Sequence, residues 1–467
     1  MSSFQRPMDD PDWRYPWPGA YKPTAKQLNT SPFLVANRRA FDLSEVRTGK
    51  TYAALWAADF LMRQHPPGKF RVLIVASLEI MDLVWGRAII ELFGGDRRSI
   101  ALKGDYKRRQ KLLARPYDFY LINADGLTAR GIADMVKARP DIQCLIVDEA
   151  SAYRHPETMR HRTLRKIVES GKPYLWLLTG TPCSQSPMDA YGLTWLVHGR
   201  PGSKATVRDR LMYLKAPGRW LPRADADEKV ARMLQPAVRW TREQCKELEN
   251  APPETWHVEP SAEQKAAFKK LQKECILRVH DGVIDAVNAA VLRGKLLQIA
   301  AGCVYDTEHN SRKIDNASRV ATLKKIIAEA PAKVIVLSTW NSVLADLEEK
   351  IENSVRIDGT LAGNDERQAR WRAFLDPAGP RVLLGQVQLV AYGLDLTVAA
   401  TTVWFSPTDV TEHYIQANGR TGGPKQKLRV QTIHLTSFEA ERKVYDKLLK
   451  NKDFQDTVLD IIREETV

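Results

Sequence analysis

Short apolar runs alternate with amphipathic segments along the first half of the chain. The runs have the length of strands buried on both faces; they are residues 71–76, 119–123, 144–147 and 174–178. Before the first of these predicted strands, Tyr52 to Arg63 repeats apolar positions with helical spacing. Strands that alternate with helices are typical of a parallel sheet covered on both faces, so the pattern predicts a doubly wound α/β domain.

The second half repeats this alternation after an interruption. Residues 200–260 contain many Pro and Gly residues and break the rhythm. Beyond them the pattern predicts helices over 261–279, 291–300 and 342–352, and buried strands at 333–338 and 381–385. We therefore expect four parts: an extended lead-in (1–20), a first α/β lobe (21–248), a linker with the helical start of the second lobe (249–320), and a second α/β lobe (321–467).

The composition agrees with a globular protein that has a basic surface. The chain has 467 residues, of which 44% are hydrophobic and 27% charged. No apolar run reaches the length of a membrane span and the first residues lack the core of a signal peptide, so a cytoplasmic location is expected. The formal net charge of +14 favours a polyanionic partner, without separating DNA from RNA. Five scattered cysteines without a Cys-x-x-Cys pair predict neither a zinc site nor a disulfide framework.

A Gly-Lys-Thr sequence stands just before the predicted helix at Tyr52. Backbone N–H groups at a helix N-terminus, together with a lysine ammonium, form a phosphate-binding site. In this arrangement Lys50 would reach the β- and γ-phosphates of a nucleotide and the Thr51 hydroxyl would bind Mg²⁺. Ser44 stands where the full pattern has Gly, so a chance surface turn is the alternative for this motif alone.

Two acids follow the predicted strand at 144–147. Ligands bind at the carboxyl ends of parallel strands, and Asp148 and Glu149 lie there. We expect Asp148 to hold Mg²⁺ and Glu149 to orient and deprotonate an attacking water. The alternative is a helix N-terminus that carries acids because of the helix dipole, but the upstream Gly-Lys-Thr disfavours it.

Two further polar segments are candidates for the same site. The strand at 174–178 ends in Thr179-Gly180-Thr181-Pro182, which adds two hydroxyls at the expected edge of the sheet. Upstream of the phosphate loop, Gln27 carries both a donor and an acceptor and is a candidate to bind an adenine edge, although a Gln before a helix is usually a surface residue.

The order of these motifs is similar to that of superfamily 2 helicases, and the nearest branch resembles the Swi/Snf-type DNA translocases. The branch is indicated by residues 178–182 followed by Tyr191-Gly192-Leu193, and by Asp148-Glu149-Ala150-Ser151 followed by Tyr153-Arg154-His155-Pro156. The resemblance implies two tandem RecA-like domains that bind ATP and Mg²⁺ in the cleft between them, with Thr48 and Gly49 also at the nucleotide. The compact size resembles phage-encoded members, which implies the host cytoplasm as location.

The resemblance also assigns motifs in the second lobe. Residues 393–397, with Gly393 and Asp395, resemble the motif that couples nucleotide state to the nucleic-acid backbone, and residues 416–426 resemble the motif that supplies arginines to the γ-phosphate. Gln416 and Arg420 match this last motif, whereas Gly423 stands where a second arginine, the arginine finger, is expected. Because such an arginine contributes about 10³–10⁵ in rate, its absence predicts slow turnover or partial replacement by Lys425.

Two basic clusters, residues 103–111 and 154–166, are expected to bind phosphates without reading sequence, although each alone fits a solvated helix face.

The expected function is an ATP-dependent DNA helicase or translocase without sequence specificity, with replication or recombination proteins as possible partners and no membrane contact. Two alternatives stay open. One is an RNA helicase of the same superfamily, because Asp-Glu-Ala-Ser is one residue from Asp-Glu-Ala-Asp. The other is an ATP-gated nucleic-acid clamp with little hydrolysis, because of Gly423.

Overall fold

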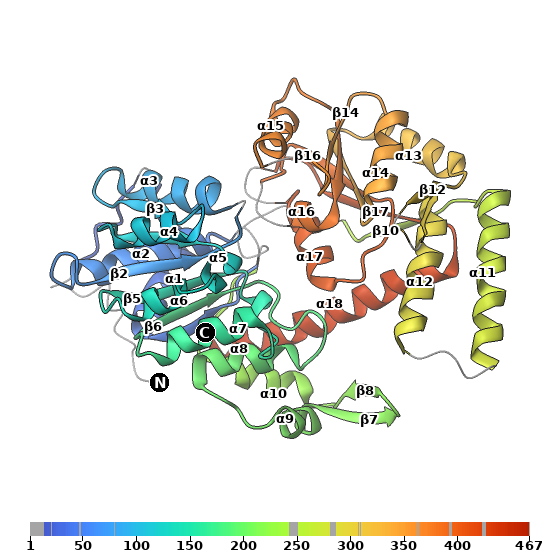
Figure 1. Ribbon diagram of the computed structural model, residues 1–467. Coiled ribbons are helices and arrows are strands. Elements are labelled where there is room, and N and C mark those ends of the chain that lie inside the picture. The colour runs from blue at the N-terminus through green and yellow to red at the C-terminus, as the bar shows by residue number, and fades with distance from the viewer. Residues whose placement is uncertain are drawn as a thin grey trace. The chain divides into compact units, whose positions relative to one another are not determined.

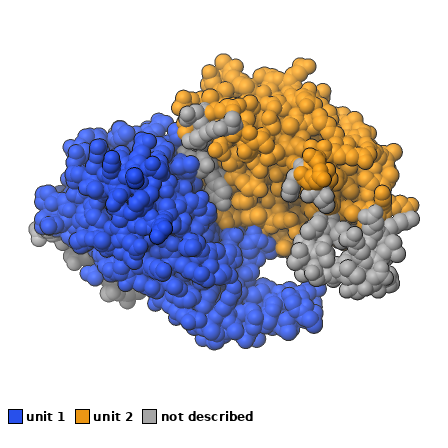
Figure 2. Space-filling view, viewed as in Figure 1, with its two compact units in different colours: residues 1–245, 451–467 blue, residues 246–450 orange. Residues whose placement is uncertain are grey.

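Two compact units make up the chain, residues 1–245 with 451–467 (unit 1) and residues 246–450 (unit 2) (Figure 2). The computed structural model describes residues 14–19, 21–45, 48–78, 80–241, 251–280, 286–306, 308, 310–361, 364–391, 395–422 and 426–466. Each unit contains one parallel sheet with helices on both faces, so the predicted α/β architecture is confirmed. The predicted lobe boundary after residue 248 lies outside the described residues.

The sheet of unit 1 has seven parallel strands in the order β3-β4-β2-β5-β6-β1-β9 (Figure 1). Its strands are β1 (Arg39–Asp42), β2 (Arg71–Val75), β3 (Ser99–Ala101), β4 (Phe119–Ile122), β5 (Ile142–Asp148), β6 (Tyr174–Leu178) and β9 (Ala237–Val238). Its helices are α1 (Ala25–Ala36), α2 (Lys50–Arg63), the π-helix η3 (Met81–Gly86), α3 (Arg87–Phe93), α4 (Tyr106–Ala114), α5 (Ala124–Thr128), α6 (Ile132–Lys137), the 3₁₀ helix η4 (Ala150–Tyr153), α7 (Met159–Glu169), α8 (Asp189–His198), α9 (Lys204–Leu211) and α10 (Ala226–Met233).

Alternate residues of each strand in unit 1 enter different cores. In β5, Leu145 and Val147 pack with residues of α5 to α10, whereas Cys144 and Ile146 pack with α1, α2, η3 and α3. This is the period-2 alternation of a strand that is buried on both faces. It explains why the sequence of β5 is almost continuously apolar.

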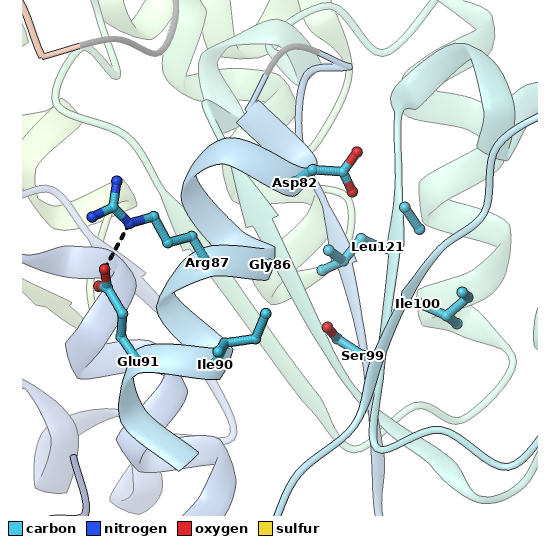
Figure 3. A pocket seen from close by; sticks show the side chains of 9 residues that line it. Asp82, Gly86, Arg87, Ile90, Glu91, Ser99, Ile100 and Leu121 are labelled. Atoms are coloured by element: carbon cyan, nitrogen blue, oxygen red, sulfur yellow. Dashed lines mark hydrogen bonds and ion pairs between the residues drawn. The ribbon is translucent and has the colours of Figure 1, made fainter. Parts of the chain in front are cut away.

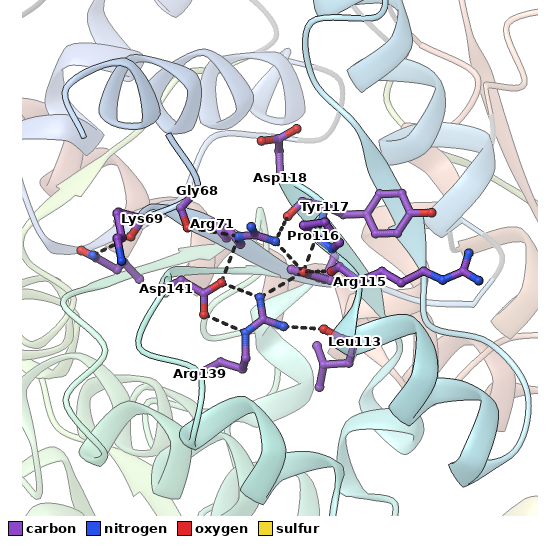
Figure 4. Close-up of polar contacts among 12 residues, drawn as sticks. Gly68, Lys69, Arg71, Leu113, Arg115, Pro116, Tyr117, Asp118, Arg139 and Asp141 are labelled. Carbon is purple, nitrogen blue, oxygen red and sulfur yellow. Dashed lines mark hydrogen bonds and ion pairs between the residues drawn. The ribbon is translucent and has the colours of Figure 1, made fainter. Parts of the chain in front are cut away.

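A polar network joins the amino ends of β2 and β5, at the opposite edge of the sheet from the strand ends that carry the predicted motifs (Figure 4). The Asp141 carboxylate lies 2.9 Å from Arg71 Nε and 2.5 Å from Arg139 Nη2. Both arginines also donate to the Tyr120 hydroxyl, at 3.0 and 3.1 Å. Partly buried, charge-assisted hydrogen bonds of this kind hold the strand starts in register.

The N-terminal lead-in packs its aromatic rings on unit 1. Tyr15 is buried and donates to Asp59 Oδ2 at 2.8 Å, and Trp17 meets Trp56 edge to face at 5.4 Å. Trp13 lies outside the described residues.

The Pro- and Gly-rich segment after β6 is more regular than its sequence indicates. It contains α9, an antiparallel hairpin of β7 (Met212–Ala216) and β8 (Arg219–Pro222), α10, and β9, which joins the seven-stranded sheet. Pro217 and Gly218 form the hairpin turn. The regular strand–helix alternation is interrupted here by the hairpin, but the sequence did not predict the hairpin itself.

Unit 2 has a six-stranded parallel sheet in the order β10-β17-β16-β13-β15-β14. Its strands are β10 (Glu254–His257), β13 (Lys333–Ser338), β14 (Ser354–Ile357), β15 (Val382–Gln386), β16 (Ala399–Trp404) and β17 (Gln431–Thr436), with a separate pair of β11 (Cys303–Tyr305) and β12 (Ser311–Lys313). Its helices are α11 (Ala262–His280), α12 (Ala286–Ala301), α13 (Ala317–Glu329), α14 (Asn341–Lys350), α15 (Asn364–Leu375), α16 (Val387–Ala391) and α17 (Thr411–Gly419), and α18 (Glu439–Thr466) begins in this unit. Two cores again cover the two faces of the sheet.

Membrane-spanning helices and the cysteines can be assessed for the described residues only. None of their helices is long and apolar enough to cross a bilayer. Cys144, Cys183 and Cys303 are buried free thiols, while Cys245 and the side chain of Cys275 lie outside the described residues.

Candidate functional site

The three polar segments predicted in the first lobe meet at one edge of the sheet. Strands β5, β6 and β1 are parallel neighbours, so their carboxyl ends lie side by side. Asp42 ends β1, Asp148 ends β5, and Thr179 follows β6 and donates its N–H to the Asp42 carbonyl at 3.0 Å. The order of these strands could not be read from the sequence, because they are separated along the chain by other elements.

The phosphate loop leads from β1 to an uncapped helix. Helices α1, α4, α7 and α9 have side-chain N-caps, but no side chain caps α2. Gly49 precedes α2 with φ +88°, and a Cβ there would lie 2.4 Å from Gln27 Nε2. Because Gly adopts this left-handed backbone conformation without steric cost, the loop conformation depends on Gly49. The first-turn N–H groups of α2, including that of Thr51, are the kind that bind an anion.

Lys50 folds back onto the loop. Its Nζ donates to the carbonyls of Ser44 at 2.5 Å and Glu45 at 2.7 Å. Burial lowers the pKa of the Lys50 ammonium, against the attraction of Asp42, Glu149 and Asp148, which raises it. The ammonium is thus within the electrostatic reach of the carboxylates at the strand ends.

Asp42 was not predicted as a site residue. It is fully buried; Oδ1 accepts the Ser44 N–H at 3.1 Å, while Oδ2 has no hydrogen-bond partner among the described residues. Burial raises the pKa of the Asp42 carboxyl, and Lys50 lowers it. The only signal in the sequence is an acid at the end of an apolar strand.

Asp148 accepts hydrogen bonds from a distant side chain and from the next backbone N–H. Its Oδ2 accepts the Trp85 indole N–H at 2.8 Å, and its Oδ1 accepts the Glu149 N–H at 3.0 Å. Trp85 is fully buried and belongs to the π-helix η3. π-Helical turns are frequent at functional sites. This positioning contact was missed because the two residues are 63 positions apart.

Glu149 has a left-handed backbone conformation, with φ 50° and ψ 53°. This region costs a residue with a Cβ of the order of 1–2 kcal/mol, and such strain is concentrated at functional sites. The residue expected to act as the base is therefore held in an unfavourable conformation by its surroundings.

The turn after β6 is connected to the segment after Glu149. Asp189 is buried and accepts the N–H groups of Gln185 at 2.8 Å and Ser186 at 3.3 Å, and its carboxylate lies 4.0 Å from Arg154 Nε. Burial raises the pKa of Asp189, and Arg154 lowers it. A Cβ at Gly192 would lie 2.3 Å from the Arg154 carbonyl oxygen. The close approach of α8 to this segment thus requires glycine.

Gln27 and Thr48 both hydrogen-bond to the phosphate loop. Gln27 Nε2 donates to the Gly49 carbonyl at 3.2 Å, and its Oε1 accepts the Thr24 N–H at 2.9 Å. Thr48 Oγ1 donates to the Glu45 carbonyl at 2.8 Å. In this structure the Gln27 amide therefore caps α1 and supports the loop, whereas its predicted contact with adenine is untested.

A separate hollow of unit 1 lies beside the edge strand β3 (Figure 3). Ile90, Ile100 and Leu121 line it together with Asp82, and Arg87 and Glu91 form an ion pair of 2.6 Å on one side. None of the residues predicted to bind nucleotide lines this hollow. It is therefore distinct from the candidate site.

In unit 2, Arg420 follows α17 and is buried. Its Nε and Nη2 donate to the Ala391 carbonyl at 3.0 and 2.5 Å, and its own carbonyl accepts the Leu396 N–H at 3.1 Å. Asp395 Oδ1 accepts the Thr397 N–H at 3.0 Å. The two predicted motifs of this lobe are thus joined through the backbone around Arg420.

Fewer contacts are described for the other predicted residues of unit 2. Gln416 is buried on α17, and its Nε2 lies 3.4 Å from Glu412 Oε1. Gly393, Gly423 and Lys425 lie outside the described residues.

Two protein-family models match most of this chain. The SNF2-related domain matches residues 43–304, and the helicase conserved C-terminal domain matches residues 318–424. A relative described as "Putative protein p41", from Acyrthosiphon pisum secondary endosymbiont phage 1, is 24% identical over 404 residues, which are 81% of this chain and 84% of that protein. The solved Sulfolobus solfataricus SWI2/SNF2 ATPase core in complex with dsDNA is 17% identical, with 97% of this chain and 96% of that chain covered and a TM-score of 0.45. Because the SNF2-related domain alone covers more than half of the chain, the protein belongs to the SNF2-related family of superfamily 2 helicases.

Proposed function

We propose that this protein is a DNA-dependent ATPase that uses ATP hydrolysis to move along DNA without sequence specificity. The observation that carries the proposal is the juxtaposition, at neighbouring strand ends, of an uncapped helix N-terminus with Lys50 and of the two acids Asp148 and Glu149. Backbone donors, a lysine and a pair of acids are the parts that phosphoryl transfer to water requires.

The chain offers ligands that fit Mg²⁺. The Thr51 hydroxyl, in the first turn of α2, and the Asp148 carboxylate are hard oxygen ligands of the kind Mg²⁺ takes, with water and phosphate oxygens completing its shell. No cluster of three His, Cys, Asp or Glu side chains that could hold a metal occurs in the described part of the chain, which agrees with a metal held partly by its nucleotide. When bound, Mg²⁺ would neutralise charge on the β- and γ-phosphate oxygens.

Lys50 must change partners when a nucleotide binds. In the structure its ammonium donates to two loop carbonyls, of Ser44 and Glu45. A phosphate at the α2 N-terminus would offer a negatively charged acceptor in their place, and an ammonium is attracted more strongly to an anion than to a neutral carbonyl. Lys50 therefore has a resting position on the loop and a proposed second position on the phosphate.

Glu149 is proposed to orient the attacking water and take its proton. The Glu149 N–H donates to Asp148, so the proposed base and the proposed metal ligand are linked through one peptide unit. From the second lobe, Arg420 is proposed to be the cation at the γ-phosphate, as the family resemblance implies. Its present hydrogen bonds to the Ala391 carbonyl would orient the guanidinium from one side.

DNA is the proposed partner because of the family and the charge. A net charge of +14 suits a polyanion, and the exposed basic residues of α4, among them Lys107 and Arg108, suit contacts with phosphates. No sequence motif for reading base edges stands out, and the part of the chain that the structure describes shows none, so we propose binding through the backbone.

The test is steady-state ATP hydrolysis without nucleic acid and with single-stranded DNA, duplex DNA, forked DNA and RNA. We expect DNA to stimulate hydrolysis and Glu149→Gln to abolish the stimulation. The matched control is Glu157→Gln, an exposed acid of the same region that pairs with Lys204 at 2.9 Å, which should hydrolyse ATP as the parent does.

Two outcomes would contradict the proposal. Stimulation by RNA alone would make the protein an RNA helicase. Binding of nucleic acid that tightens with ATP, without hydrolysis above the Glu149→Gln level, would make it a clamp.

A further inference from the structure

The β7–β8 hairpin of unit 1 forms a sheet of its own, apart from the seven-stranded sheet. It extends as a ribbon from the region of α9 and α10 (Figure 1). An isolated two-stranded ribbon has too little core to be stable alone, so its conformation depends on how its base is attached.

The base of the hairpin is fixed to its two flanking helices. The Arg223 N–H donates to the Leu211 carbonyl at 2.9 Å, and the Arg223 Nε donates to the Asp209 carbonyl at 2.9 Å. Lys229 Nζ, on α10, donates to the Arg210 carbonyl at 3.2 Å. The hairpin is therefore held at one end while its turn, at Pro217 and Gly218, is exposed.

Large apolar side chains occupy both faces of the ribbon. Tyr213 is 43% exposed and Leu214 is 54% exposed, and successive residues of a strand point to opposite faces. The register pairs Tyr213 with Leu221 and Leu214 with Trp220. Trp220 packs partly against the core of unit 1, so the exposed apolar surface of the ribbon comes mainly from Tyr213 on one face and Leu214 on the other. Exposed apolar surface marks interaction sites when it is not buried in the fold.

The charge around these side chains is positive. Between residues 204 and 223 the chain has six basic residues and one acid, Asp209, which pairs with Arg208 at 3.1 Å. Arg210, Lys215 and Arg219 are exposed, and their side chains form no ion pair or hydrogen bond with the described residues. The Arg208 guanidinium lies over the Trp220 ring at 3.9 Å and adds positive charge beside that face.

We propose that the β7–β8 hairpin binds single-stranded nucleic acid, with the Tyr213 ring stacking on an unpaired base, Leu214 contacting a base on the other face, and Lys215 and Arg219 binding the adjacent phosphates. An exposed aromatic ring beside basic side chains is the combination that holds single strands, because every base has a stacking face and every linkage a charge. A paired duplex offers phosphates but no free base face. This inference rests on the proposed function and adds to it a preference for DNA with an unpaired strand.

The test compares the affinity of the full chain for single-stranded, forked and blunt duplex DNA by fluorescence anisotropy. For Tyr213→Ala combined with Leu214→Ala, we expect a loss on the order of tenfold for single-stranded and forked DNA and no change for the duplex. Tyr213→Phe should bind as the parent does, because the ring is retained. Ile90→Ala, which truncates a 66% exposed apolar residue of α3, is the matched control and should also bind as the parent does.

A second readout follows the base itself. Stacking on Tyr213 should quench or shift the fluorescence of 2-aminopurine placed in the single strand, and Tyr213→Ala should remove this change. Thermal denaturation checks that the variants are folded, and exposed positions should leave the melting temperature unchanged.

The failures are distinguishable. If the parent chain binds no nucleic acid, the proposed function fails. If the parent binds but the double variant keeps its affinity for single strands, only the hairpin inference fails. An equal loss for duplex and single strands would overturn base stacking, and loss of binding to a protein partner with DNA binding intact would make the hairpin a protein-docking surface.

Discussion

The left-handed conformation of Glu149 predicts an inversion of the usual order of Gly and Ala. At ordinary positions Ala is more stable than Gly by about 0.5–1 kcal/mol, because Gly loses more backbone entropy on folding. At φ 50° and ψ 53° a Cβ costs about 1–2 kcal/mol, and Gly does not pay this cost. The difference leaves Glu149→Gly more stable than Glu149→Ala by about 0.5–1 kcal/mol.

The comparison removes the carboxylate in both variants, so the electrostatic change at Asp148 and Lys50 cancels. The assay is urea denaturation followed by tryptophan fluorescence, with the free energy of unfolding taken from the midpoint and slope. Ala152→Gly is the control: Ala152 is exposed on η4, three residues after the strained position, and this change should destabilise the protein by about 0.5–1 kcal/mol.

Opposite signs at the two positions would show that strain is stored at residue 149. If Glu149→Ala is as stable as Glu149→Gly or more so, the left-handed conformation costs no more than the backbone entropy of Gly, and the argument fails. Both variants should lack DNA-stimulated hydrolysis, because both lack the proposed base.

Three further predictions follow from single contacts. Trp85→Phe removes the indole donor to Asp148 and should lower the affinity for Mg²⁺ in the presence of ATP about 10–100-fold. An unchanged Mg²⁺ titration of ATP binding would contradict the positioning role. Gly192→Ala puts a Cβ 2.3 Å from the Arg154 carbonyl oxygen and should destabilise the protein by about 1–3 kcal/mol; an unchanged melting temperature would show that the helix moves freely. Burial lowers the pKa of His434 from 6.5 to about 4, so the folded state favours the neutral ring. The stability from this group is complete above pH 6.5 and falls by about 3 kcal/mol as the pH drops to 4, and His434→Phe should show a shallower loss over that range, whereas equal slopes would refute the assignment.

Elements buried on both faces were the easiest to predict. The expected strands 174–178 and 333–338 coincide with β6 and β13, because a strand covered by helices on both sides has a continuous apolar run with clear ends. The β7–β8 hairpin and β9 were missed. Their residues are few or exposed, so no apolar period marks them, and their Pro and Gly residues resemble those of an irregular connector.

The residues of the candidate site also fall into two groups, those that the sequence predicted and those that it did not. Lys50 and Asp148 were identified because a local motif carries each of them, and the structure brings their strand ends together. Asp42 and Trp85 were not identified, since their part in the site depends on burial and on contacts between distant segments. The roles proposed for Arg420, Gln416 and Asp395 come from the family resemblance alone.

The π-helix η3 restricts the number of residues after β2 as well as their chemistry. A π turn holds one residue more than an α turn, and in Met81–Gly86 this wider turn buries Trp85 against Asp148 while Leu83 is 40% exposed. Deletion of one residue would favour ordinary α-helical winding and rotate the positions before the deletion by about 100° relative to α3. Such a frame shift would separate the indole from the carboxylate even if every remaining side chain were conserved. This segment should therefore accept substitutions at its exposed positions and reject any change in its length.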